Sequence, residues 1–554
     1  MLKYKITILT LLTICLNGFS QDYVSPFDFE LKLSGTFGEL RNNHFHAGID
    51  IKTNETEGHP IYSIADGYVS RIKVSTWGYG KTIYINHPDG NTSVYAHMQE
   101  FSPKIKKYVE KIQNRKESFE IQVYPEKDDL IISQGETIGL SGNTGSSGGP
   151  HLHFEIRDTK SEHPLNPLRF NFKVQDDIAP VISSVKIYAH EGASINETTD
   201  PIILQVNKKE GKYKTTHDLI TVNGDISFGI STFDRQNASP NNKNGVYSIK
   251  LFIDNTLIHH FMVDEISFAE TRFINAHIDY KEYMDNNVRY NRCYSLPYNN
   301  LSNYYQNVNK GIYTFSDTLL HNIRFEVEDF EKNLSTVDFQ VKSSTKIIKK
   351  KKTYKKVLKY NESNIYKKDK IKIHMKKYSL YEDCILEYST SKKRKNSLSE
   401  IHHVINASTP VQKYYVLSIK EDIPKRLINK SYIAKLNRNG SLSYRGGEWK
   451  DGFLSVKIRE FGDFCITADT INPFISFKKH VNNIISCNIK DNESGISYYR
   501  GELNGNWILM EYEHKKNLLT CVLPKNLKKG SHTLKVFVKD KVNNLSEKSF
   551  EFTY

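Results

Sequence analysis

The segment GGPHLHFEI, residues 148–156, places His151 and His153 one residue apart in an apolar run. Apolar residues alternate with them from Leu152 to Ile156, which is the period-two pattern of a half-buried strand. Residues two apart on a strand share one face, so both imidazoles are expected to point the same way. Two histidines on a solvated strand face would give the same pattern, so a metal site requires further ligands elsewhere in the chain.

The segment HFHAGIDI, residues 44–51, supplies such ligands. If this segment is extended, His46, Gly48 and Asp50 share one face, and Gly48 leaves room between the other two. Two ring nitrogens and a carboxylate oxygen suit zinc, which at a catalytic site takes three protein ligands and keeps a fourth position for water. The predicted ligand set is therefore His46, Asp50 and one histidine of the 151/153 pair.

His97 stands at the end of a third alternating segment, SVYAHMQ at residues 93–99. The chain has no HExxH sequence to supply a catalytic glutamate. His97, together with the histidine of the pair that does not bind metal, is then a candidate acid/base or charge-stabilising group of a zinc hydrolase. A single histidine after a strand is often structural, so this assignment depends on the zinc site.

Taken together, these three motifs resemble the lysostaphin/LytM-type zinc metallopeptidases, which cleave peptide bonds in bacterial peptidoglycan. The resemblance extends over residues 33–170 and includes SIADGYVSRI (63–72), GYGKTIYINH (78–87) and GETIGLSGNTG (135–145). It implies the duplicated hybrid motif fold, built on an antiparallel β-sheet.

The resemblance also implies a role for each candidate residue. His46, Asp50 and His153 correspond to the family's Zn²⁺ ligands, and His97 and His151 correspond to the catalytic pair that flanks the water. Some members of the family have lost ligands and only activate other wall hydrolases, whereas all five residues are present here. The implied function is a secreted zinc-dependent endopeptidase that hydrolyses the peptide cross-links of peptidoglycan.

Two other functions stay open. The first is a non-catalytic envelope scaffold that recruits or activates another cell-wall hydrolase, with a segment such as residues 34–46 in the fourth zinc position. The second is a peptidase that acts on protein substrates. The sequence does not assign the general base between His97 and His151.

The connection after His97 is longer than the family resemblance leads us to expect. Ser102 as N-cap and Pro103 at the first helical position predict a helix, with apolar residues from Ile105 to Ile112 on one face. Two interpretations are open: the insertion shapes the substrate groove, or it is a solvated flap.

The rest of the chain contains a repeat. IAPVIS at 178–183 parallels INPFIS at 471–476, and the pattern V-x-D-x-x-x-N-L-S-x-x-x-F occurs at 327–339 and again at 538–550. Each copy of the second pattern predicts a hairpin. Both units resemble bacterial immunoglobulin-like sandwiches.

The predicted fold is therefore mainly β, with an N-terminal antiparallel β-sheet metallopeptidase domain followed by two or three immunoglobulin-like β-sandwich domains. The predicted organisation is a signal peptide (1–20), a zinc metallopeptidase domain (21–172), an immunoglobulin-like β-sandwich with insertions (173–345), a Lys-rich linker or strip (346–378), a β-rich domain (379–469) and a C-terminal immunoglobulin-like β-sandwich (470–554).

Positive charge is concentrated in one segment. Residues 346–377 hold fourteen lysines against Glu362 and Asp369, which gives +12 of the chain's formal net charge of +14. In a cell envelope the partners of such a strip are anionic polymers or lipid headgroups. Nucleic acid is the usual interpretation of a basic strip, but the predicted export argues against it. A solvated linker is the alternative.

The first twenty residues predict export. Lys3 and Lys5 precede an apolar stretch over residues 6–16, and a small-residue site follows, with cleavage after Ser20. Cys15 raises a lipoprotein alternative, but the residue before it is bulky. The mature chain has no stretch long enough to be a transmembrane segment, so the predicted location is the periplasm, the cell envelope or the medium. Among the remaining cysteines, Cys487 and Cys521 form a candidate disulfide.

Overall fold

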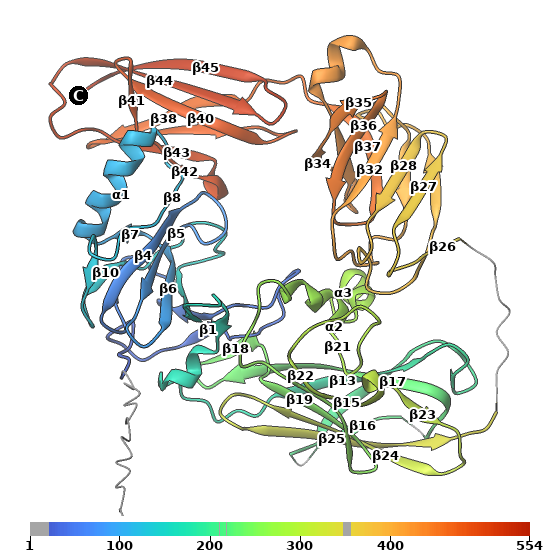
Figure 1. Ribbon diagram of the computed structural model, residues 1–554. Helices are drawn as coiled ribbons and strands as arrows, with labels where there is room; N and C mark the ends of the chain where they lie inside the picture. Colours follow the sequence, from blue (N-terminus) through green and yellow to red (C-terminus); the bar gives the residue numbers. More distant parts are fainter. Residues whose placement is uncertain (1–21, 210, 218, 347–355) are drawn as a thin grey trace, which may run out of the picture.

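The computed structural model describes residues 22–209, 211–217, 219–346 and 356–554. The prediction of a mainly β protein is confirmed: four β-rich parts follow one another along the chain, with few helices. Figure 1 shows these parts arranged around a circuit that brings the last one beside the first. The predicted signal peptide, residues 1–20, lies outside the described residues. Among the helices that are described, none combines the length and apolar composition needed to cross a membrane.

The N-terminal domain contains a nine-stranded and a three-stranded sheet. The strands of the larger sheet are β1 (Leu33–Gly35), β2 (Ile49–Lys52), β4 (Gly67–Val74), β5 (Lys81–Asn86), β6 (Asn91–Met98), β8 (Ile121–Val123), β9 (Ile131–Ile132), β11 (His151–Asp158) and β12 (Pro164–Leu165). The smaller sheet contains β3 (Pro60–Tyr62), β7 (Glu100–Phe101) and β10 (Thr137–Leu140).

The order of strands in the larger sheet brings three distant segments together. The path runs β1-β2-β11-β6-β5-β4-β8, and every pairing is antiparallel. Leu152, Phe154 and Ile156 of β11 are fully buried in the apolar core, as the alternating pattern predicts. The opposite face of the same central strands is therefore left to carry polar side chains.

The insertion after β7 folds as predicted at its start. Helix α1 (Pro103–Lys116) begins with Pro103 after Ser102, and it buries Ile105, Val109 and Ile112. Because these side chains belong to the core of the domain, the insertion is a packed element rather than a solvated flap. Glu117, at its end, forms an ion pair of 2.6 Å with Arg500 of the C-terminal domain.

The second part is a thirteen-stranded sheet system. Its strands are β13 (Val181–Ala189), β14 (Ser194–Ile195), β15 (Ile202–Lys209), β16 (Lys212–Thr215), β17 (Ile220–Gln236), β18 (Ser239–Asn244), β19 (Ser248–Ile253), β20 (Thr256–Met262), β21 (Asn291–Arg292), β22 (Tyr304–Asn307), β23 (Tyr313–Phe315), β24 (Leu320–Glu328) and β25 (Leu334–Ser343). Two short helices, α2 (Ile274–His277) and α3 (Tyr280–Asn286), lie on the side that faces the third part (Figure 1).

The third part consists mainly of two five-stranded sheets around one core. One sheet contains β27 (Asn364–Lys368), β28 (Ile371–Met375), β32 (Tyr415–Lys420), β35 (Glu448–Lys450) and β36 (Phe453–Ile458). The other contains β30 (Tyr388–Ser391), β31 (Ile401–Val404), β33 (Ser431–Leu436), β34 (Leu442–Gly446) and β37 (Gly462–Ala468), and the pair β26 (Val357–Leu358) and β29 (Cys384–Ile385) lies beside them.

The Lys-rich segment does not form a separate linker over its described length. Strand β28 pairs with β32, and Ile371, Ile373 and Met375 are buried in the core of the third part. The period-two alternation of these apolar residues with lysines places the charges on the other face. Residues 347–355 of the predicted strip lie outside the described residues.

The C-terminal part contains two four-stranded sheets with one apolar core between them. The first is built from β38 (Phe474–Val481), β39 (Ile484–Lys490), β42 (Glu511–Glu513) and β43 (Leu518–Val522), and the second from β40 (Ile496–Leu503), β41 (Asn506–Ile508), β44 (Ser531–Asp540) and β45 (Leu545–Thr553). Cys487 and Cys521 are both buried free thiols, so the predicted disulfide is wrong. The two cysteines lie on neighbouring strands, but Cys487 is opposite Leu519 and Cys521 is opposite Ile485.

Candidate metal centre and catalytic site

Three adjacent strands of the N-terminal sheet carry the predicted site residues. Strand β2 is antiparallel to β11, and their register pairs Asp50 with His153. On the other side of β11, His153 pairs with Ala96 of β6, which places His97 at the next position. His46 lies three residues before β2 begins. The sheet thus brings together all five residues that the sequence singled out.

Gly48 is required where β2 approaches β11. A Cβ atom at this position would lie 2.2 Å from the carbonyl oxygen of Phe154 and 2.8 Å from Cγ of Glu155. Any side chain here would push the strands apart. The sequence predicted free space beside Gly48, and in the structure the backbone of β11 occupies that space.

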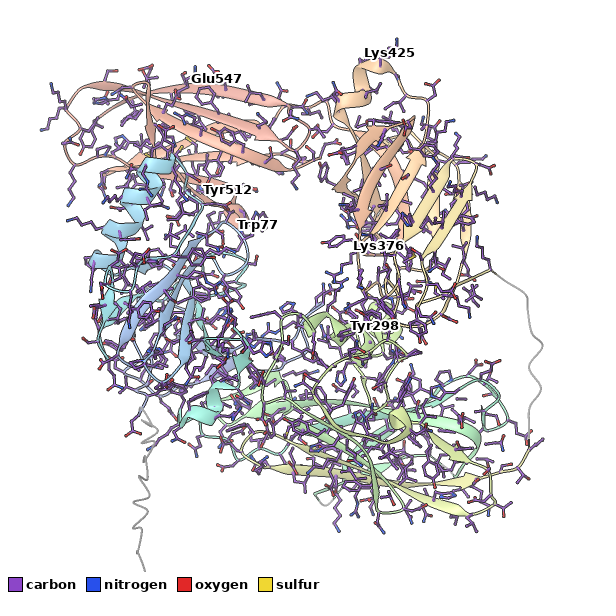
Figure 2. All side chains as sticks on the ribbon, in the orientation of Figure 1. Trp77, Tyr298, Lys376, Lys425, Tyr512 and Glu547 are labelled. Atoms are coloured by element: carbon purple, nitrogen blue, oxygen red, sulfur yellow. The ribbon has the colours of Figure 1, made fainter. Side chains whose placement is uncertain are left out.

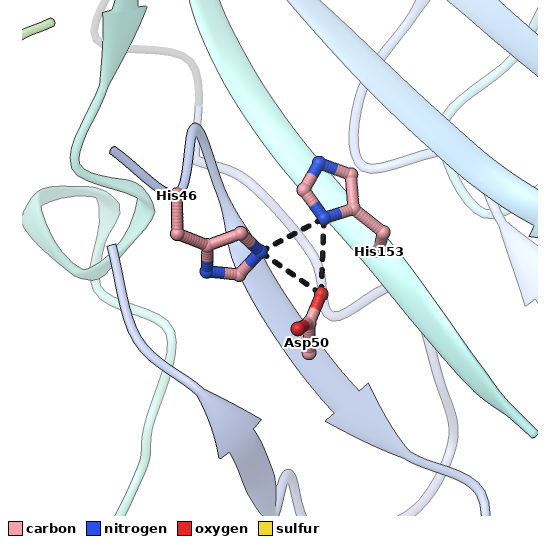
Figure 3. Close-up of side chains that lie close together, drawn as sticks. All are labelled: His46, Asp50 and His153. Carbon is pink, nitrogen blue, oxygen red and sulfur yellow. Dashed lines mark hydrogen bonds and ion pairs between the residues drawn. The ribbon is translucent and has the colours of Figure 1, made fainter. Parts of the chain in front are cut away.

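His46, Asp50 and His153 form a compact buried cluster (Figure 3). Nε2 of His46, Nδ1 of His153 and Oδ1 of Asp50 lie 3.0 Å from one another in all three pairs. Each side chain belongs to a residue that is at most 7% exposed. Two ring nitrogens and one carboxylate oxygen therefore converge on one point.

Contacts on the far side of each imidazole orient the two rings. Nδ1 of His46 lies 2.8 Å from the carbonyl oxygen of Thr36, which only accepts hydrogen bonds, so this nitrogen carries the proton. Nε2 of His153 lies 2.8 Å from Oε1 of Glu155, which fixes the same arrangement there. In these tautomers the facing nitrogens have free lone pairs. Such outer contacts are usual for histidines that bind metal, so the three residues fit a zinc ion.

Glu155 anchors a second set of buried charges behind His153. Its Oε2 accepts a hydrogen bond of 2.5 Å from Nε of Arg157, and Tyr79 donates its hydroxyl hydrogen to Oε1. Burial opposes ionisation of Glu155, but Arg157 and His153 outweigh it and lower its pKa to about 2. Glu155 therefore stays a carboxylate and can hold the Nε2 hydrogen of His153.

The electrostatics of the cluster favour a positive charge at its centre. Burial opposes the charged form of His153, yet hydrogen bonds to Asp50 and Glu155 raise its pKa to about 9. Burial also opposes ionisation of Asp50, but His46, His151 and His153 hold its pKa well below the usual range. Arg41 donates to the outer oxygen of Asp50 at 3.0 Å. A cation at the centre satisfies the convergent acceptors.

His97 and His151 lie beside this cluster. Their ring centroids are 4.9 Å apart, and Nε2 of His151 lies 3.5 Å from Oδ1 of Asp50. Nδ1 of His97 lies 2.8 Å from the carbonyl oxygen of Thr144, and Nδ1 of His151 lies 2.8 Å from that of Gly149. Both rings therefore direct an unprotonated Nε2 away from the backbone.

His97 adopts an unusual backbone conformation. Its φ angle is +61°, in the left-handed region that side chains with a Cβ rarely occupy. Burial, and then the neighbouring His153 and His151, lower the pKa of its imidazole to about 3. The ring is therefore neutral near neutral pH.

The C-terminal domain contacts the loop that precedes His151. Nζ of Lys515 donates to the carbonyl oxygen of Ser147 at 3.2 Å, and the Ser147 hydroxyl lies 3.2 Å from Nδ1 of His151. The rings of Trp77 and His514 also meet, with centroids 3.7 Å apart. Figure 2 shows Trp77 and Tyr512 at this junction. The far end of the chain thus contacts the loop that carries His151 into β11.

The residues behind the cluster were not selected from the sequence. Glu155 and Arg157 continue the face of β11 that carries His151 and His153, so the period of two could have indicated them. Arg41 and the carbonyl of Thr36 had no such signal, because they depend on how residues 34–46 fold over the cluster.

The comparisons with known proteins agree with this geometry. Residues 44–114 and 122–167 match peptidase family M23, and residues 355–469 match the Zu5-like domain. The gap in the first match falls at the end of helix α1. The second match begins inside the predicted linker, in accord with the strands found there.

Individual relatives match a part of this chain. The DD-carboxypeptidase/endopeptidase Mpg of Neisseria meningitidis is 30% identical over 142 residues, which cover 25% of this chain and 26% of that protein. Lysostaphin of Staphylococcus staphylolyticus is 27% identical over 186 residues, covering 33% of this chain and 31% of lysostaphin. The chain thus spans about a quarter to a third of the length of these curated relatives.

Among solved structures, the catalytic domain of lysostaphin from Staphylococcus simulans is 24% identical; the match covers 25% of this chain and 91% of that domain, with a TM-score of 0.19. The family match includes all five site residues, from His46 to His153. Residues 44–167 of the chain therefore contain a domain of peptidase family M23.

Proposed function

We propose that this protein is an exported zinc-dependent endopeptidase that cleaves peptide cross-links of bacterial peptidoglycan. The observation that carries the proposal is the convergence of His46, Asp50 and His153, with His97 and His151 beside them. Relatives named as endopeptidases and as lysostaphin support the substrate class.

The ligands of the zinc ion would be Nε2 of His46, Oδ1 of Asp50 and Nδ1 of His153. When bound there, zinc supplies Lewis-acid activation of water and of the scissile carbonyl. The protein holds these atoms in place through Thr36 and Glu155. Because the rings cannot rotate without losing these hydrogen bonds, the site is preorganised for its metal.

His97 and His151 would move the proton and stabilise charge. One imidazole accepts the proton of the attacking water at Nε2 and passes it to the leaving amine. The other donates a hydrogen bond to the oxygen that becomes negative in the transition state. Because both rings present an unprotonated Nε2, either one can accept the proton, and the ring that donates must first be protonated.

The scaffold alternative predicts a protein that binds the wall without cutting it. The five residues are all present and their atoms converge, which supports catalysis over this alternative. The contact of Lys515 with the loop before His151 bears on access, because it brings the C-terminal domain to the rim of the site. Peptidoglycan is the proposed partner, and anionic envelope polymers or lipid headgroups are proposed for the Lys-rich segment.

The test uses residues 21–554 loaded with zinc and incubated with isolated peptidoglycan sacculi. Muropeptides are then identified by mass spectrometry. The proposal predicts that cross-linked dimers disappear in favour of monomers, and that a chelator stops the reaction and added zinc restores it. The control is a chain ending at residue 172, which removes the contact of the C-terminal domain. Intact cross-links with both proteins would rule out the endopeptidase and leave the scaffold.

A further inference from the structure

A second buried cluster lies where the M23 domain meets the next part of the chain. Asp176 precedes β13, Asp234 lies near the end of β17, and Asp329 occupies the turn between β24 and β25. One carboxylate oxygen from each lies within 4.8 Å of the others. The residues are 9%, 2% and 2% exposed, respectively. Three carboxylates have therefore been brought together out of contact with water.

Two buried acceptors at this cluster lack hydrogen-bond partners. In the part of the chain that the structure describes, Oδ1 of Asp234 and Oε1 of Gln236 are buried and accept no hydrogen bond. Both residues line a cavity of about 20 Å³, together with Asp176 and Asp329. Such a volume holds one small ion or one water. Unsatisfied buried acceptors are rare in folded proteins because each costs free energy.

The charges nearest to the cluster are also negative. Burial, and then the carboxylates of Asp176 and Asp329, raise the pKa of Asp234 to about 8. Glu331 adds to the same effect on Asp176 and Asp329. Among the described residues, no positively charged side chain is a main cause of these three pKa shifts. A cation from solution would therefore supply the missing positive charge.

The C-terminal domain provides an internal comparison. Asp469, Asp491 and Asp540 form the equivalent cluster there. The hydrogen bonds around the two clusters correspond. Asn333 donates to the backbone carbonyl of Asp176 at 3.0 Å, and Asn544 donates to that of Asp469 at 3.0 Å. The repeated N-L-S motif therefore forms a similar turn, here called a corner, beside each of the two aspartate clusters.

The two corners differ in how their carboxylates are satisfied. In the C-terminal cluster, the backbone N–H and the hydroxyl of Ser494 both donate to Oδ2 of Asp469, at 3.1 and 2.7 Å. Asp491 accepts two further backbone hydrogen bonds. The first cluster instead leaves an oxygen of Asp234 without a donor. The unsatisfied acceptors thus belong to the first corner.

We propose that Asp176, Asp234, Asp329 and the side-chain oxygen of Gln236 bind a calcium ion. Calcium takes oxygen ligands at about 2.3–2.6 Å, so opposite ligands lie about 4.6–5.2 Å apart, which suits oxygens spread over as much as 4.8 Å. Magnesium needs a smaller octahedron and holds its waters tightly. The absence of nitrogen and sulfur donors disfavours zinc.

This calcium site would brace the joint between two domains. Thr36 of the N-terminal domain lines the same cavity. Its hydroxyl accepts a hydrogen bond of 2.9 Å from the backbone of Gly245, which follows β18. The carbonyl of the same Thr36 holds Nδ1 of His46. Calcium would therefore stabilise the segment that orients one proposed zinc ligand.

The test is a titration of the full chain, stripped of metals and reloaded with one equivalent of zinc, with CaCl₂ in a calorimeter. Asp234→Asn keeps the shape of the side chain but removes its charge, and Asp491→Asn is the matched control in the C-terminal cluster. We expect one calcium ion to bind the wild-type chain and the control, with Kd between about 10⁻⁶ and 10⁻³ M. Binding to Asp234→Asn should be at least about tenfold weaker, and MgCl₂ should compete poorly.

Thermal unfolding without calcium provides a second readout. Asp234→Asn removes a carboxyl whose ionised form is disfavoured by burial and by Asp176 and Asp329, so it should unfold at a higher temperature than the wild type in metal-free buffer. Calcium should raise the unfolding temperature of the wild type and leave that of the variant unchanged. The proposal fails if the wild type binds no calcium, if both variants bind it equally well, or if Asp234→Asn is unfolded or destabilised without calcium.

Discussion

The His46–Asp50–His153 cluster and the Asp176–Asp234–Asp329 cluster are both buried groups of three side chains, yet their ligand atoms suit different ions. In the first, each histidine has a second hydrogen-bond partner that fixes which nitrogen faces inward. In the second, all the candidate ligand atoms are oxygens, and one of them, Oδ1 of Asp234, accepts no hydrogen bond. The comparison shows that the surroundings of a cluster, as much as its members, indicate which ion fits.

The largest expected effect separates the two clusters by loss of zinc. His153→Ala removes one of three ligands together with its contact to Glu155, so the proposed zinc site should lose its metal and its peptidase activity completely. Calcium should still bind, because His153 is not among the proposed calcium ligands. Zinc and calcium per chain are measured by elemental mass spectrometry, and cross-link cleavage on sacculi. Zinc retained in this variant would mean that the ligands are assigned wrongly.

A smaller effect distinguishes ligands from the proposed acid/base residues. His151→Ala should leave zinc bound and lower turnover by about 10²–10⁴-fold, the size of a lost proton-transfer group. His97→Ala should do the same. Turnover is compared at equal zinc content, with Asp491→Asn, which lies outside the proposed zinc cluster, as a control. Loss of zinc from His151→Ala, with zinc kept in His153→Ala, would reverse the roles of the pair.

The next prediction concerns the contacts that distinguish the two clusters. Glu155→Gln keeps a hydrogen-bond acceptor for Nε2 of His153 but removes the charge, and it breaks the ion pair with Arg157. Zinc affinity should fall by about 10–100-fold, as is typical when the outer partner of a metal-binding histidine is changed. Competition with a zinc indicator gives the affinity. An unchanged affinity would show that Glu155 stabilises the fold without acting on the metal.

The smallest expected effect links the two clusters. Thr36→Val removes the hydroxyl that bonds to Gly245 but keeps the carbonyl that holds His46. In the wild type, calcium should tighten zinc binding by about fivefold, at the low end of coupling between sites. In the variant this gain should vanish. The same zinc titration, with and without CaCl₂, checks it, and an equal calcium effect in both proteins would exclude Thr36 as the connection.

The sequence determined the ligand types of the proposed zinc centre. Alternation on β11 placed His151 and His153 on one face, and the spacing of His46 and Asp50 supplied the remaining donors, because a strand period of two is a local property of the backbone. The repeated V-x-D-x-x-x-N-L-S pattern likewise predicted the turns that carry Asp329 and Asp540, since each turn forms within one hairpin. The start of helix α1 followed from Ser102 and Pro103.

Only the tertiary structure decided what depends on contacts between distant segments. It selected Nε2 of His46 and Nδ1 of His153 as the inward nitrogens, because Thr36 and Glu155 hold the opposite atoms. It brought Asp234 to Asp176 and Asp329, which lie on other strands, and it folded β28 of the Lys-rich segment into a sheet. Local pattern fixes which face a side chain occupies, whereas burial and partners arise only when separate strands pack together.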